Sequence, residues 1–136
     1  MRSGRRMLLL VIAVLFICGC GDGRIKARGR IVKNGEPFHL NEGEGMRIVF
    51  VPVKVGGEKY DSYVAVFETD GSFKVTGKDG KGLPPGKYRV DLEHLKKKKD
   101  LFKGAFAGKK SPIIREVRGS DEIVIDLNNP GRDSGS

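Results

Sequence analysis

The chain has 136 residues, of which 38% are apolar and 32% charged, with a formal net charge of +9 and a sequence pI near 9.7. The length excludes a large multidomain enzyme, the two cysteines exclude a disulfide-stapled miniprotein, and the apolar content excludes an entirely disordered chain.

The amino terminus has the pattern of an export signal. Arg2, Arg5 and Arg6 form a positively charged region, and the apolar run 7–18 follows without interruption. This run has 12 residues, whereas a membrane-spanning helix needs about 20. It therefore predicts the hydrophobic region of a secretory signal peptide.

The four residues Ile17-Cys18-Gly19-Cys20 resemble the lipobox of bacterial lipoproteins, in which a small residue precedes an invariant cysteine. The resemblance implies cleavage between Gly19 and Cys20, a diacylglyceryl group on the Cys20 thiol and an acylated new amino terminus, for instance with palmitate. Two or three acyl chains make a stable membrane anchor where one is marginal. The alternatives are an ordinary signal peptide that is cut elsewhere and a short uncleaved anchor.

Removal of residues 1–19, which include three arginines and no acidic residue, leaves 117 residues with a net charge of +6. Cys20 is then the one remaining cysteine and carries lipid, which excludes a disulfide and a cysteine zinc site. Gly21 is not the Asp that retains some lipoproteins in the inner membrane, which favours the outer membrane. The expected organisation is a signal peptide at 1–19, a lipidated cysteine with a short linker at 20–24, a β-domain at 25–127 and a flexible tail at 128–136.

The mature chain is predicted to be all β. Residues 24–32 alternate basic and nonpolar side chains with the period of a strand, and Asn34-Gly35 predicts a turn after them. Six further strands are expected at 46–53, 63–69, 72–76, 87–92, 113–117 and 122–127.

Two of the expected connections have recognisable sequences. Asp70-Gly71 predicts a β-hairpin between 63–69 and 72–76. The last two strands are expected to pair with each other around residues 119–121. Within the stretch 94–111, residues 97–106 are expected to form either one helical turn or a loop.

Seven short strands with alternating faces predict a two-sheet sandwich. Both alternations of residues 63–67 are apolar, and Val64 and Val66 are assigned to the inner face. The predicted core is Ile31, Ile48, Phe50, Val64, Val66, Phe73, Val75, Tyr88, Val90, Leu92, Ile123 and Ile125.

Three segments in order, 29–37, 69–75 and 83–90, resemble the carboxypeptidase regulatory-like (transthyretin-like) β-sandwich domain, in the form found in small bacterial lipoproteins. The most specific part is the Asp-Gly-x-Phe hairpin followed by Leu-Pro-x-Gly-x-Tyr-x-Val. The resemblance implies a seven-stranded Greek-key, prealbumin-like sandwich that acts as a scaffold or a binding module without catalysis. Its motif residues have structural roles here: Asp70, Gly71, Phe73, Pro84, Pro85, Gly86 and Tyr88.

No catalytic or metal-binding motif is found in the sequence. His39 and His94 stand in different segments, without HExxH or paired-histidine spacing, and the loop carboxylates lack calcium-loop spacing. Residues 117–120 resemble the Tyr-Arg-Gly-Ser ending of a transthyretin-like ureide hydrolase, but Val117 replaces the tyrosine and the segment is internal. We therefore expect no enzyme activity, cofactor or metal, and keep the hydrolase as a remote alternative.

Two basic clusters are the candidate binding residues. Arg24, Lys26, Arg28 and Arg30 lie on one face of the first strand, and Lys96, Lys97, Lys98 and Lys99 begin a second cluster that continues to Lys103, Lys109 and Lys110. They are either solvated faces or contacts for anionic headgroups or envelope polymers.

The resulting hypothesis is a lipid-anchored, non-enzymatic protein of the cell envelope. Its partners would be membrane lipid through Cys20 and anionic surfaces, and export places the domain away from nucleic acid. The alternative is a carbohydrate- or peptide-binding module, for which Tyr60, Phe102 and Phe106 are the available loop aromatics.

Overall fold

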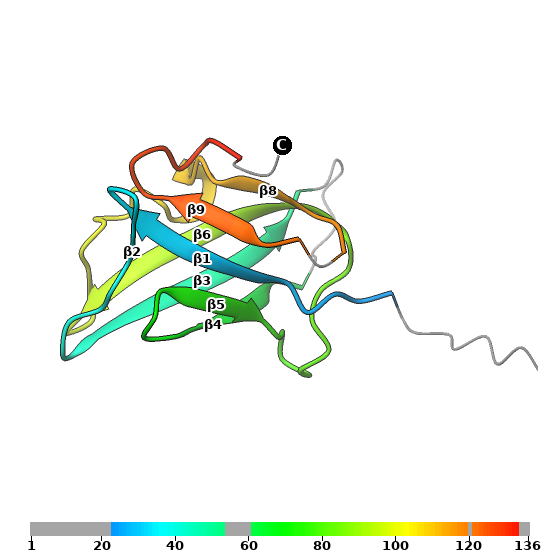
Figure 1. The fold of residues 1–136 in the computed structure, drawn as a ribbon, viewed down its shortest axis with the longest axis horizontal. Helices are drawn as coiled ribbons and strands as arrows, with labels where there is room; N and C mark the ends of the chain where they lie inside the picture. Colours follow the sequence, from blue (N-terminus) through cyan, green and yellow to red (C-terminus); the bar gives the residue numbers. More distant parts are fainter. Residues whose placement is uncertain (1–22, 54–60, 120, 134–136) are drawn as a thin grey trace, which may run out of the picture.

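The computed structural model describes residues 23–53, 61–119 and 121–133, so the predicted signal peptide and Cys20 lie outside the described residues. The described chain is all β, with one short 3₁₀ helix (Figure 1). Its elements are β1 (Arg28–Lys33), β2 (Glu36–Pro37), β3 (Glu44–Pro52), β4 (Tyr63–Phe67), β5 (Ser72–Val75), β6 (Gly86–Lys96), β7 (Lys99–Asp100), η1 (Gly108–Lys110), β8 (Ile114–Val117) and β9 (Ile123–Asp126).

The strands form one curled sheet in which the main order is β9-β1-β5-β4-β3-β6-β8. Each neighbouring pair is antiparallel except β1 and β9, which are parallel. The two-residue strands β2 and β7 add to β1 and β6. The curl brings β8 and β9, the two ends of this order, to the same side of the molecule (Figure 1).

The predicted pairing of the last two strands with each other is wrong. β8 pairs with β6, and β9 crosses to the other end of the sheet and pairs with β1. This arrangement covers one edge of β1 and one edge of β6, whereas a local hairpin could have covered only one of them. It also places Ile123 and Ile125 in the core.

Ten of the twelve predicted core residues are buried, and the two predicted on β4 are not. Val64 and Val66 are 44% and 51% exposed, whereas Ala65 between them is 5% exposed. The register explains the difference, because Ala65 lies opposite Ile48 on β3 and directly opposite residues share a face. Since Ile48 faces the core, Ala65 does so too.

The β4–β5 hairpin forms at Asp70-Gly71 as predicted. Asp70 Oδ1 accepts a hydrogen bond of 2.9 Å from the Ser72 amide, and Gly71 has a φ of +87°. The hairpin delivers Phe73 to the core, where its ring packs against Gly29 of β1. A β-carbon at Gly29 would overlap that ring and the carbonyl oxygen of Ile123, so β1, β5 and β9 approach closely only because this residue is glycine.

The loop between β5 and β6 pairs with residues just before β1. Ile25 and the buried Leu83 exchange backbone hydrogen bonds of 2.8 and 2.9 Å. Pro84 provides a carbonyl oxygen for the Tyr88 hydroxyl, and burial raises the pKa of Tyr88 to about 12. Pro85, just before β6, and Gly86, its first residue, are both exposed.

Residues 97–106 contain no helical turn, and the predicted loop is interrupted by the short strand β7. β6 extends to Lys96, and Lys97-Lys98 form a two-residue hairpin loop to β7. Turns occupy residues 101–106 and lead to η1. The hairpin was missed because its loop contains neither Gly nor Asn.

The expected flexible tail makes contacts as far as residue 133. Asn128 Nδ2 donates a 3.0 Å hydrogen bond to Asn34 Oδ1, and the carbonyls of Pro130 and Arg132 accept hydrogen bonds from Arg115. The contacts of the domain therefore continue beyond residue 127, where the sequence predicts the domain to end.

Candidate functional site: two basic surfaces

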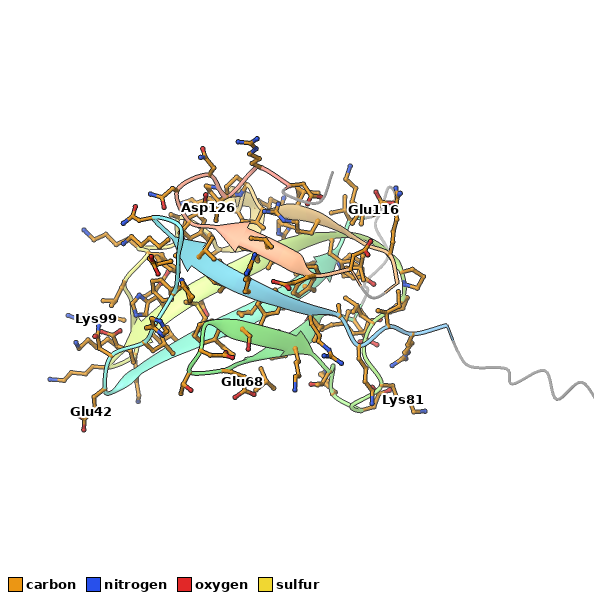
Figure 2. The ribbon with its side chains drawn as sticks, in the orientation of Figure 1. Glu42, Glu68, Lys81, Lys99, Glu116 and Asp126 are labelled. Carbon is orange, nitrogen blue, oxygen red and sulfur yellow. The ribbon has the colours of Figure 1, made fainter. Side chains whose placement is uncertain are left out.

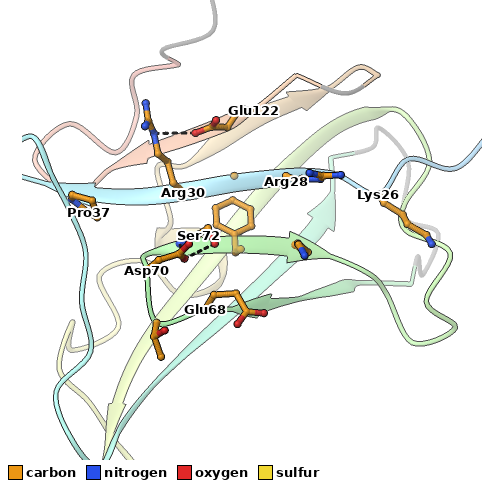
Figure 3. A pocket seen from close by; sticks show the side chains of 12 residues that line it. Lys26, Arg28, Arg30, Pro37, Glu68, Asp70, Ser72 and Glu122 are labelled. Atoms are coloured by element: carbon orange, nitrogen blue, oxygen red, sulfur yellow. Dashed lines mark hydrogen bonds and ion pairs between the residues drawn. The ribbon is translucent and has the colours of Figure 1, made fainter.

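The outer face of β1 carries the first predicted basic cluster and borders a shallow hollow of about 960 Å³ (Figure 3). Gly29 and Ile31 of β1 face the interior, and Arg28 and Arg30 are exposed on the outer face. The hollow is lined by Lys26, Arg28, Gly29, Arg30, Pro37, Glu68, Thr69, Asp70, Ser72, Phe73, Lys74 and Glu122.

Charges in this hollow are only partly balanced. Arg30 Nε lies 2.9 Å from Glu122 Oε1. The Asp70 carboxylate accepts hydrogen bonds from Ser72, which lower the pKa of Asp70. Within the described ranges, Lys26, Arg28 and Lys74 have no ion pair. Arg28 and Lys74 are directly opposite each other on β1 and β5. Like charges in this position repel, so the pair favours an anion close to both.

Arg24 marks the point at which the domain begins. Its guanidinium lies 2.7 Å from Asp79 Oδ2 in the loop before β6. The backbone amide of Lys81 and then Arg24 hold the pKa of Asp79 below its usual value. Arg24 is four residues after Cys20, so the predicted lipid attachment point is close in sequence to this end of the molecule.

The second predicted cluster divides into two parts. Lys96, Lys97, Lys98, Lys99 and Lys103 surround the β6–β7 hairpin loop, and we call these five residues the lysine tip. Lys109 and Lys110 lie in η1, which leads to Ser111 beside Val90 in the middle of β6, and so belong to another part of the surface.

The lysine tip and the start of the domain are at opposite ends of β6. Ile25 pairs with Leu83 just before Gly86 begins the strand, and Lys96 ends it. Ten residue steps at about 3.3 Å each give a separation of about 33 Å. Figure 2 shows Lys81 of the first end and Lys99 of the lysine tip far apart on the long axis. The structure therefore does not bring the two predicted clusters together.

His94 is not the isolated histidine that the sequence suggests. Its Nε2 lies 2.8 Å from Glu44 Oε2, and the Glu44 side chain is only 3% exposed. Hydrogen bonds from His94, from Asn41 and from Lys96 lower the pKa of Glu44 to about 2. Phe38 and Phe102 pack against the His94 ring with centroid distances of 5.2 and 5.4 Å.

Two of the three loop aromatics that could serve a carbohydrate- or peptide-binding site pack beside His94 or against each other. Phe102 and Phe106 are partly buried and pack against each other with a centroid distance of 5.0 Å. Both rings therefore take part in packing within the domain. Tyr60 lies outside the described residues.

Arg115 is a buried arginine that the sequence analysis did not single out. Its side chain is 1% exposed and donates hydrogen bonds to the carbonyls of Ile114, Val124, Pro130 and Arg132. It thereby joins β8 to β9 and to the tail, and burial lowers its pKa from the usual value. The alternation of the strand could have revealed it. Arg115 is two residues from Ile113 and two from Val117, so all three side chains lie on the core face.

The described residues contain no group of three or more His, Cys, Asp or Glu side chains that could hold a metal ion. Arg118 of the hydrolase-like segment pairs with Glu116 at 2.7 Å, and His39 Nδ1 lies 3.1 Å from the Thr69 carbonyl oxygen.

No helix among the described residues has the length and apolarity needed to cross a membrane.

In comparisons with known proteins, no family model matches this chain, and no similar curated protein or solved structure was found.

Proposed function

We propose that this chain is a lipid-anchored protein of the bacterial cell envelope, whose β-domain is a non-enzymatic binding or scaffold module of the prealbumin-like sandwich type. The observation that carries the proposal is the lipobox-like sequence ending at Cys20, four residues before Arg24. Five extended residues span at most about 17 Å. The domain would therefore be held close to the membrane, with the outer membrane favoured by Gly21.

The outer face of β1, β5 and β4 supports contact with an anionic surface. Lys26, Arg28 and Lys74 have no ion pair among the described residues, and Val66 lies opposite Lys74 on β4 with half of its surface exposed. Cations beside exposed apolar side chains suit the headgroup region of an anionic membrane.

The anchor is tested by replacing its cysteine in the cell. Cys20→Ser removes the thiol that would carry the diacylglyceryl group, so we expect loss of fatty-acid labelling and release of the protein from the membrane fraction. Cys18→Ser is the matched control, since Cys18 would leave with the signal peptide, and it should keep both properties. Labelling and membrane retention of the Cys20→Ser protein equal to wild type would refute the anchor.

A second candidate function is carbohydrate or peptide binding. The observation that favours it is the hollow on β1 and β5, which is lined by both cations and carboxylates. A glycan and peptide array probed with residues 24–136 would separate this function from a purely structural one. The transthyretin-like hydrolase is a remote third candidate, and the described residues give no observation that favours it.

A further inference from the structure

Three residues of the lysine tip have a backbone conformation that lysine rarely adopts. The φ angles of Lys97, Lys98 and Lys103 are +48°, +64° and +53°. Among the described non-glycine residues, Asn34 is the one other case, and asparagine tolerates this conformation. A two-residue hairpin loop with positive φ at both positions strongly favours Asn-Gly. Because strained backbone positions cluster at functional sites, these lysines are candidates for a functional role.

The acidic residues of the same end form few ion pairs with these lysines. Asp100 accepts hydrogen bonds of 3.0, 3.0 and 2.8 Å from the backbone amides of His94, Phe102 and Gly104. Glu44 is nearly buried against His94 and pairs with Lys96. Glu42 is exposed at this end (Figure 2).

Four ammonium groups of the lysine tip therefore remain without an ion pair among the described residues. They belong to Lys97, Lys98, Lys99 and Lys103.

We propose that the lysine tip binds a flexible polyanion of the cell envelope, a polymer with repeating phosphate or carboxylate groups. Lysine ammonium groups are compact charges on flexible stems, and they attract anionic groups without requiring a fixed orientation. The lysines of the tip lie in a hairpin loop, beside it and in the adjoining turn. Such an arrangement suits several spaced charges on one chain better than one small anion.

The distance of the tip from the anchor favours a polymer over the membrane, and this step rests on the proposed lipid anchor. The tether of residues 20–24 would hold the Arg24 end of the domain within about 17 Å of the bilayer. The lysine tip is about 33 Å farther along β6. It is therefore the end of the domain farthest from the anchor.

The experiment uses the full lipidated protein in neutral phosphatidylcholine nanodiscs and measures binding of fluorescent long-chain polyphosphate at low salt. The test variant is Lys97→Asn with Lys98→Gly, which suits the hairpin loop and removes two charges. The control is Lys78→Gln with Lys81→Gln, which removes two exposed charges at the other end. A second arm replaces polyphosphate with phosphatidylglycerol vesicles.

We expect the test variant to bind polyphosphate about tenfold more weakly, and the control variant to bind within about twofold of wild type. Equal losses in both variants, or no loss in the test variant, would overturn the proposal. So would vesicle binding that depends on Lys97 and Lys98 without polyphosphate binding. The Cys20→Ser protein should keep tip-dependent polyphosphate binding, so a failed anchor is distinguished from a failed tip.

Discussion

Gly29 is the position at which the packing of the sheet can be tested most sharply. A β-carbon there would overlap the carbonyl oxygen of Ile123 and the Phe73 ring, whose Cε1 would lie 2.7 Å away. Gly29→Ala must therefore either displace a fully buried ring or move β9 away from β1. Overpacking of a closed core costs about 1–3 kcal/mol, and a lost backbone hydrogen bond about 1 kcal/mol more.

We expect Gly29→Ala to lower the free energy of unfolding by about 3 kcal/mol, which for a domain of this size lowers Tm by about 12 °C. Far-UV circular dichroism during heating and urea titration both measure the change. Gly45→Ala is the matched control, because a β-carbon at Gly45 of β3 would meet no atom within 4 Å. It should leave Tm unchanged or slightly raised. A Gly29→Ala Tm within about 2 °C of wild type would refute the packing argument.

Two further substitutions test the buried polar groups. The pKa of Glu44 lies at about 2 and its ordinary value is 4.5, so Glu44 stabilises the domain above about pH 4.5, and this contribution is lost as the pH falls towards 2. Glu44→Gln should lower Tm at neutral pH and reduce its fall on acidification; the same acid dependence as wild type would contradict this. Arg115→Met removes the buried guanidinium that donates to the carbonyls of Val124, Pro130 and Arg132, and it should cost about 2–4 kcal/mol. Urea denaturation measures this loss, with the exposed Arg118→Met as control. An unchanged urea midpoint for Arg115→Met would show that water or other groups replace the guanidinium.

Features that depend on neighbouring residues could be predicted from the sequence. The β4–β5 hairpin followed from Asp70-Gly71, and the inward positions of β3 and β6 followed from their alternation. On β4 the alternation itself was ambiguous, because both faces are apolar. Only the register with β3, which places Ala65 opposite Ile48, decides which face is buried.

Features that depend on distant residues could not be predicted. Glu44 and His94 are 50 positions apart, and only the pairing of β3 with β6 brings them into contact. The partners of β8 and β9 are equally remote in sequence. The Lys97-Lys98 loop was missed for a different reason, since its strained backbone contradicts the local preference on which a turn prediction depends.

The parallel pairing of β1 with β9 has a consequence for the order in which the domain folds. Gly29 lies opposite Ile123, so the first strand of the domain receives one of its two main partners from the last. A chain that emerges amino terminus first exposes the β9-facing edge of β1 until nearly the whole domain has appeared. Pairing over such a long separation closes slowly. The fold thus delays its own completion until the last strand is available to pair with the first.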